Sequence, residues 1–366
     1  MVKLICSSCG REYLPTYKEY KCSSCGGLLN LQFEAKFPLN EIKRRKPTMW
    51  RYREAIPIEK DESIVSFDEG FTPLLLIPIN NHKIWVKQDH LFQSGSYKDR
   101  GASVLISHVK EIGVKSVVED SSGNAGAAIA AYSTKAKIKC DIFVPEKTSS
   151  SKISQIMAYG ARIHKIGQTR EETAKAVLRE VENKYYASHV YNPYFLQGTK
   201  TFAYEVTEQL GWKAPDVVIL PVGNGTLLLG AYIGFTDLFK AGITKKVPKI
   251  ISVQAANCAP LAAAFSKKND KANFHVKSTI AEGIAIAVPM RANQIIDAVK
   301  RTKGHFVTVN EEEIMASFEE MARNGYHMEP TAAATFAGVQ KYIEESESRK
   351  NEVIVSTITG HGLKNK

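Results

Sequence analysis

From residue 84 onward, short strand-like runs alternate with longer helical runs, and this alternation limits the fold more than any other feature. The strand-like runs are rich in Val and Ile, whereas the helical runs are amphipathic. The predicted strands are Ile84–Lys87, Ser116–Glu119, Cys140–Val144, Arg162–Ile166, Val217–Val222, Ile250–Gln254 and Val353–Ile358. The predicted helices include Ala125–Thr134, Lys152–Tyr159, Glu171–Asn183, Lys200–Leu210 and Leu227–Ala241. Such alternation is typical of parallel sheets with helices on both faces, so we predict an α/β fold with doubly wound sheets.

Four polar, glycine-containing stretches each follow one of these strands. They are Phe92–Gly101, Ser121–Asn124, Pro221–Thr226 and Thr359–Gly362. Ligands of open α/β sheets bind beyond the carboxyl ends of the strands, where helices begin. These four stretches are therefore the candidate binding loops.

The first loop carries Lys98 just before a helical run over Ala102–Val109. A lysine amine forms Schiff bases with carbonyl cofactors, which makes Lys98 the candidate catalytic residue. Taken alone, Lys98 would be interpreted as an ordinary surface lysine in a first helical turn. The chemistry of the other loops favours the catalytic interpretation.

The third loop is the candidate phosphate site and contains Gly223, Asn224, Gly225 and Thr226. Glycines let successive backbone N–H groups converge on an anion, and the following helix adds the positive end of its dipole. The loop has neither the lysine of a Walker motif nor the spacing of a dinucleotide fingerprint. A plain strand-to-helix connection is the alternative.

The remaining two loops supply hydroxyl and amide groups. Ser121, Ser122 and Gly123 open a helix and suit a carboxylate, and Asn124 suits a phenolic oxygen on a ring cofactor. The same residues would also cap the helix, and both interpretations can hold together. A hydroxyl at Thr359 suits a pyridine nitrogen. Together, the four loops have the parts of a pyridoxal phosphate site.

Residues 1–35 form a separate unit with two C-x-x-C pairs, each followed by glycine. The cysteines are Cys6, Cys9, Cys22 and Cys25. Four thiolates at this spacing typically hold a structural zinc ion, and glycine lets the backbone turn toward the sulfur atoms. We expect a two-stranded ribbon through Glu12–Tyr13 and Leu28–Phe33. Four reduced cysteines without metal are the alternative.

Composition narrows the class of protein further. The 366 residues are 44% hydrophobic and 24% charged, which is enough for two globular domains. No apolar run approaches the roughly 20 residues of a membrane span, and the apolar start is too short for a signal peptide, so we expect a cytoplasmic protein. The net charge of +11 is scattered. Its longest basic run, Lys43–Lys46, has little aromatic interleaving, so we interpret it as solvated surface and expect no nucleic-acid partner.

The chain resembles the threonine synthases, which are fold type II pyridoxal phosphate enzymes of the tryptophan-synthase-β-like group. The resemblance covers nearly the whole chain. It is carried by the cysteine segment and by Trp50–Tyr52, Glu69–Leu74, Gly95–Gly101, Ser122–Asn124, Asn192–Tyr194, Glu282–Ile284, Glu329–Pro330 and Thr359–Lys364. It implies a zinc-ribbon-like segment over residues 1–35, a large cofactor domain over 36–110 and 190–366, and a small α/β domain over 111–189.

The resemblance also implies a role for each candidate residue. Lys98 would form the Schiff base and shuttle protons, Asn124 would bond the ring oxygen, and Thr359 would face the ring nitrogen. Gly223–Thr226 would hold the cofactor phosphate, and Ser121–Gly123 the substrate carboxylate. The implied reaction converts O-phospho-L-homoserine and water into L-threonine and phosphate, in a homodimer with no membrane partner.

Two positions depart from the family pattern. Phe92–Ser94 replaces the Asn-Pro-Thr of many members, and Phe195 replaces an arginine that reaches the substrate phosphate. Phe cannot bind a dianion as Arg does. Lys87, Lys200 and Arg162 are the candidate substitutes, and we predict Lys87 as a substrate-binding residue.

Three hypotheses therefore stand. The first is threonine synthase. The second is a related enzyme with the same cofactor, such as a threonine or serine dehydratase or a β-replacing synthase, which the change at Phe195 would explain. The third is a zinc-ribbon binding protein with a degenerate α/β part, and the intact Lys98 argues against it.

Overall fold

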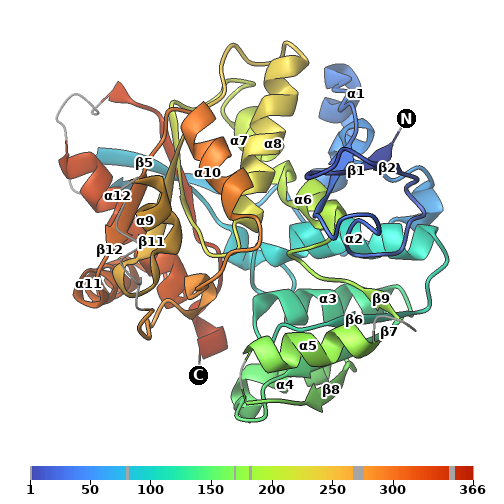
Figure 1. Cartoon of the computed structure of the whole chain (residues 1–366). Coiled ribbons are helices and arrows are strands. Elements are labelled where there is room, and N and C mark those ends of the chain that lie inside the picture. Colours follow the sequence, from blue (N-terminus) through green and yellow to red (C-terminus); the bar gives the residue numbers. More distant parts are fainter. Residues whose placement is uncertain are drawn as a thin grey trace. The chain divides into compact units, whose positions relative to one another are not determined.

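The computed structural model describes residues 2–79, 82–168, 170–180, 184–266, 276–345 and 351–365. By the proximity of their Cα atoms, the residues form two compact units. The first contains Met1–Gly70 and Lys98–Thr199, and the second contains Phe71–Tyr97 and Lys200–Asn365. This division places residues 36–70, 98–110 and 190–199 in the same unit as the four-stranded sheet, whereas the sequence assigned them to the large domain. The domain boundaries inferred from the sequence stay a prediction. Figure 1 labels many of the helices and strands of both units.

The first unit contains two sheets. A small antiparallel sheet has the order β2-β1-β3, and a fully parallel sheet has the order β8-β7-β6-β9. The strands are β1 (Lys3–Cys6), β2 (Glu12–Tyr13), β3 (Leu29–Gln32), β6 (Ser116–Glu119), β7 (Lys139–Val144), β8 (Arg162–Lys165) and β9 (Tyr185–Tyr186). The helices are α1 (Leu39–Arg44), α2 (Lys98–Glu111), α3 (Asn124–Lys135), α4 (Ser150–Ala158), α5 (Arg170–Glu180) and α6 (Pro193–Thr199), with short 3₁₀ turns at Met49–Ala55 and Asp61–Ser63.

The second unit is built on a six-stranded sheet with the order β12-β11-β10-β13-β5-β4. Every neighbouring pair is parallel except β4 with β5. The strands are β4 (Leu74–Ile79), β5 (His82–Lys87), β10 (Val217–Pro221), β11 (Lys249–Ala255), β12 (Phe306–Val309) and β13 (Ile354–Thr357). The helices are α7 (Thr201–Gln209), α8 (Thr226–Lys240), α9 (Pro260–Phe265), α10 (Ala292–Arg301), α11 (Glu311–Arg323) and α12 (Pro330–Glu344), with 3₁₀ turns at Asp89–Leu91, Ala256–Cys258, Glu282–Ile284 and Gly362–Asn365.

The seven predicted strands are all present, and the α/β class is confirmed. Both faces of the central strands are buried, as β10 illustrates with five consecutive buried residues. The end of the helix predicted over Glu171–Asn183 lies outside the described residues. One boundary matters for function. The helix expected from Ala102 begins four residues earlier, at Lys98, so α2 also includes the polar residues that precede the apolar run.

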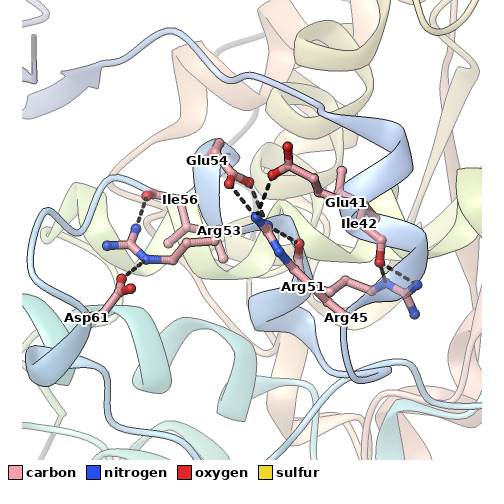
Figure 2. A network of polar contacts seen from close by, with 8 residues as sticks. All are labelled: Glu41, Ile42, Arg45, Arg51, Arg53, Glu54, Ile56 and Asp61. Atoms are coloured by element: carbon pink, nitrogen blue, oxygen red, sulfur yellow. Dashed lines mark hydrogen bonds and ion pairs between the residues drawn. The ribbon is translucent and has the colours of Figure 1, made fainter.

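Arg45, which belongs to the basic run Lys43–Lys46, forms hydrogen bonds and an ion pair within the first unit (Figure 2). Arg45 binds both carboxylate oxygens of Glu54, at 2.7 and 2.5 Å, and also donates to the backbone carbonyl of Arg51. Arg51 in turn donates to the carbonyl of Ile42, at 2.8 Å from Nη2. Lys46 pairs with Asp68 at 2.6 Å. These carboxylate partners offset part of the local positive charge.

In the part of the chain that the structure describes, every helix is too short or too polar to cross a membrane.

Candidate active site

Lys98 lies in the first turn of α2, and a phenylalanine from α6 packs beneath it. The Nζ atom of Lys98 is 5.8 Å from the centre of the Phe195 ring, a cation–π contact. Phe195 is fully buried, and a Cβ atom added at Gly101 would overlap its ring. Glycine at position 101 therefore allows α6 to approach α2 closely and fixes the ring under the candidate catalytic amine.

The loop between β6 and α3 brings Ser121, Ser122, Gly123 and Asn124 together. Gly123 is the N-cap of α3 and has no side chain to cap it, so the first N–H groups of the helix are not capped from that position. The backbone folds tightly, because a Cβ at Gly126 would overlap the carbonyl oxygen of Ser121. Backbone donors and partly exposed hydroxyls at one helix N-terminus fit a carboxylate.

Two residues that the sequence did not indicate lie beside this loop. Glu119 ends β6 with a fully buried side chain, and its Oε1 is 2.7 Å from Nδ1 of His189. Burial raises the pKa of Glu119 to about 8, although the charge of Lys98 acts to lower it. Burial likewise raises the pKa of Asp120 to about 6, and the charge of Glu119 adds to that effect. From the sequence, Glu119 could be interpreted only as the last residue of the strand predicted over Ser116–Glu119.

In the second unit, the predicted phosphate loop follows β10 and leads into α8. Gly225 is the N-cap of α8 in the left-handed region, with φ 76°, and a Cβ there would overlap the side chain of Ile295. A Cβ at Gly223 would lie 2.9 Å from the Cα of Ile284. Neighbouring atoms leave no room for a side chain at either glycine, and the turn lies at the N-terminus of a 15-residue helix. Such a turn fits the phosphate of a cofactor.

The turn before Lys98 is held against the end of β13. Within the second unit, the N–H of Tyr97 donates to the carbonyl oxygen of Thr359 at 3.0 Å, and Ser96 forms a bridge with Gly360. The hydroxyl groups of Thr359 and Ser96 are buried without a hydrogen-bond partner among the described residues. A buried hydroxyl without a partner is costly, so Thr359 fits the role of a ligand for a ring nitrogen. Ser96 is a candidate polar group that the sequence analysis missed.

The three basic residues named as substitutes for the missing arginine already bind carboxylates. Lys87 is completely buried, with Nζ 2.8 Å from Oε2 of the equally buried Glu205. Nζ of Lys200 is 3.0 Å from Oδ2 of Asp237, and Nε of Arg162 is 2.8 Å from Oδ1 of Asp141. Each cation therefore has a structural role in its own unit, and the predicted substrate role of Lys87 stays without support from its surroundings.

The four N-terminal cysteines converge as predicted. Their sulfur atoms all lie within 4.8 Å of one another, with Cys6 to Cys25 at 3.4 Å and Cys9 to Cys22 at 3.6 Å. Four sulfurs bound tetrahedrally to zinc would be about 3.8 Å apart. The glycines after each pair have positive φ angles, as the turn chemistry requires.

The strands around these cysteines differ from the expected ribbon. The predicted strands β2 and β3 do not pair with each other. Both pair with β1, so the segment is a three-stranded sheet.

These features fit a site for a phosphorylated ring cofactor, with Lys98 as the candidate residue that would bind it. The sequence matches the family model described as pyridoxal-phosphate dependent enzyme over residues 65–360, and the chain belongs to that family. Within it, the chain belongs with the threonine synthases. It is 34% identical to the threonine synthase of Methanocaldococcus jannaschii over 98% of this chain and 92% of that protein. It is 33% identical to the threonine synthase of Methanosarcina acetivorans over 100% of this chain and 92% of the relative.

Solved structures show the same fold across several activities. The chain is similar to serine racemase from Dictyostelium discoideum, with a TM-score of 0.66 and 26% identity over 80% of this chain and 92% of that chain. It is also similar in fold to threonine deaminase isoform 2 from Solanum lycopersicum, with a TM-score of 0.69 and 22% identity over 90% and 86% of the two chains. The shared fold does not by itself define the reaction.

Proposed function

We infer that this chain is a pyridoxal-phosphate-dependent threonine synthase, which converts O-phospho-L-homoserine and water into L-threonine and phosphate. The observation that carries this conclusion is the similarity to threonine synthases over essentially the full length of the chain. The substrate is accordingly a small amino acid.

The described residues suit the cofactor on three independent grounds. Gly223 and Gly225 form a turn that side chains would fill, Thr359 has a buried hydroxyl without a partner, and Lys98 begins a helix. When bound, pyridoxal phosphate supplies the electron sink for the reaction. We propose that Lys98 binds it covalently and moves protons, and that Asn224 and Thr226 complete the phosphate loop.

We propose further roles for the loop between β6 and α3. Ser121, Ser122 and Gly123 would hold the carboxylate of the amino acid through hydroxyl and backbone N–H donors, and Asn124 would bond the ring oxygen of the cofactor. The open N-terminus of α3 favours this assignment, because its amides suit an anion.

A related activity on an unphosphorylated amino acid is the second candidate. The observation that favours it is Phe195, a fully buried apolar residue at the position where the family pattern has an arginine. Lys87, Lys200 and Arg162 are each bound to a carboxylate, so none of them offers an uncompensated charge for the substrate phosphate.

We also propose that the four cysteines bind one structural zinc ion. A closed set of four thiolates leaves no open coordination position, so the metal would stabilise the three-stranded sheet rather than take part in the reaction. A cytoplasmic homodimer completes the proposal; it rests on the family resemblance, and light scattering of the purified protein tests the oligomeric state.

The proposed function is tested by offering three substrates separately to the cofactor-loaded protein: O-phospho-L-homoserine, L-threonine and L-serine. Threonine and phosphate in equal amounts from the first substrate would support the synthase. Ammonia and a 2-oxoacid from the other two, with no product from the first, would support the related activity. In either case Lys98→Ala should abolish turnover while the circular dichroism spectrum is unchanged.

A further inference from the structure

A tyrosine from strand β9 holds the residue that leads into Ser121–Asn124, which we call the substrate loop. Asp120 lies between the end of β6 and this loop. The hydroxyl group of Tyr186 donates to Oδ1 of Asp120 at 2.9 Å. Strand β9 pairs in parallel with β6, with Tyr186 opposite Val118, so a neighbouring strand fixes the position of the donor. The substrate loop therefore starts from a side chain that is tied to the sheet.

The ring of Tyr186 is itself held firmly. It is 3% exposed and belongs to a small apolar cluster with Val118, Phe143 and Val177. Because such clusters are closely packed, the hydroxyl group has little freedom to move, and it directs Asp120 toward β9. Within the substrate loop, the N–H of Gly123 donates to Oγ of Ser121 at 3.3 Å, which shapes the loop without attaching it to the sheet.

The cysteine segment, residues 1–35, packs against this cluster through Tyr20. The ring of Tyr20, two residues before Cys22, meets the ring of Tyr186 edge-on, with the centres 5.4 Å apart. It also meets the ring of Tyr191 edge-on, at 5.3 Å. Nζ of Lys21 lies 5.2 Å from the centre of the Tyr191 ring. Edge-on ring pairs and cation–π contacts are both attractive, so the cysteine segment and the parallel sheet are joined here.

Other contacts join the neighbours of Tyr20 to the cysteine cluster. The hydroxyl oxygen of Tyr13 is 2.9 Å from Sγ of Cys22. The rings of Tyr13 and Tyr17 stack with their centres 4.2 Å apart, and the hydroxyl group of Tyr17 donates to the carbonyl oxygen of Lys21 at 3.2 Å. The backbone next to Tyr20 is therefore tied to the same cysteines that would bind the metal.

We propose that Tyr186 is a positioning residue for the substrate loop, and that the cysteine segment holds Tyr186 in place through Tyr20. This inference rests on the proposed role of the substrate loop in binding the substrate carboxylate. Tyr186 acts through Asp120: it fixes the point at which the chain leaves β6, and with it the direction of the hydroxyl and N–H donors that follow. Hydrogen bonds weaken steeply when their angles are poor, so a displaced loop binds the carboxylate less well.

The test is steady-state kinetics of the full-length, cofactor-loaded enzyme on whichever substrate the wild type converts: O-phospho-L-homoserine, L-threonine or L-serine. Tyr186→Phe removes only the hydroxyl group, and Tyr20→Leu removes the edge-on ring. We expect each change to raise KM about tenfold and to leave kcat within about twofold of the wild type, because the carboxylate is bound equally in the ground state and the transition state. The double variant should have the KM of Tyr186→Phe, because Tyr20 acts through Tyr186.

Tyr342→Phe is the matched control. Tyr342 is also a buried tyrosine, and its hydroxyl group donates to Oε2 of Glu352 at 2.9 Å, but it belongs to α12 in the second unit. Its KM should equal that of the wild type, and a tenfold rise there would show that losing any such hydrogen bond raises KM, which would refute the positioning role.

The remaining outcomes separate the two parts of the proposal. An unchanged KM in Tyr186→Phe, folded by circular dichroism, would overturn it as a whole. An unchanged KM in Tyr20→Leu, or additive increases in the double variant, would remove the cysteine segment from it. If Tyr186→Phe does not fold, an unchanged KM in Tyr20→Leu would overturn the proposal. A wild type that converts none of the three substrates would contradict the proposed function instead.

Discussion

Replacing Lys87 by methionine should destabilise the protein without selectively weakening substrate binding. Nζ of Lys87 lies 2.8 Å from Oε2 of Glu205, and both side chains are completely shielded from solvent. The same ammonium donates to the carbonyl oxygen of Thr72 at 2.6 Å and to Oε1 of Gln209 at 2.7 Å. Lys87→Met preserves the length of the side chain but leaves Glu205 as a buried charge without its cation. Breaking a pair of this kind costs about 3–5 kcal/mol.

Urea unfolding of four proteins would measure this cost: the wild type, Lys87→Met, Glu205→Leu and the double variant. We expect each single variant to lose about 3–5 kcal/mol in the free energy of unfolding. The double variant should recover most of that loss, because two apolar side chains can replace a buried ion pair at little net cost. Its KM for O-phospho-L-homoserine should be close to that of the wild type.

The opposite pattern would refute this reasoning. If Lys87 binds the substrate, as the sequence led us to expect, Lys87→Met would raise KM while the free energy of unfolding stayed the same. The double variant would then keep the raised KM.

Three further predictions follow from other contacts. Gly101→Ala should destabilise the first unit by about 1–3 kcal/mol, because the new Cβ overlaps the Phe195 ring, and Phe195→Leu in the same chain should relieve part of the loss in a thermal melt. Cys22→Ser should release zinc on metal analysis and lower the melting temperature, whereas serine at the buried Cys258 should leave the metal content unchanged. Burial raises the folded-state pKa of Glu119 from 4.5 to about 8, so its stabilising contribution is complete below pH 4.5 and is lost as the pH rises through 8. Glu119→Gln should therefore remove much of the fall in stability between pH 5 and 9 in urea unfolding, and equal pH slopes would contradict this.

The sequence predicted the parts of the site that depend on neighbours along the chain. The loops at Ser121–Asn124 and Gly223–Thr226 follow strands and open helices as expected, because glycine and hydroxyl residues determine such turns locally. The cysteine cluster was readable for the same reason, since its ligands come in closely spaced pairs.

The sequence could not predict which residues from distant segments of the chain contact each other. Lys87 looked available for a substrate, but its carboxylate partner comes from α7. Glu119 read as the end of a strand, and only the folded chain brings His189 onto it. In the sequence, Phe195 differed from the family pattern because it replaces a charged arginine. In the structure, its ring packs against Gly101, which explains why a flat apolar side chain suits that position. The pairing of β1 with both β2 and β3 is likewise a register that local propensity does not determine.

The central claim is that this chain makes threonine by adding water to a carbon atom of O-phospho-L-homoserine after its phosphate has left. The most direct test is turnover in water labelled with ¹⁸O, followed by mass spectrometry of both products. We predict one labelled oxygen in the hydroxyl group of threonine and none in the released phosphate. Labelled phosphate together with unlabelled homoserine would show simple ester hydrolysis and would contradict the assignment.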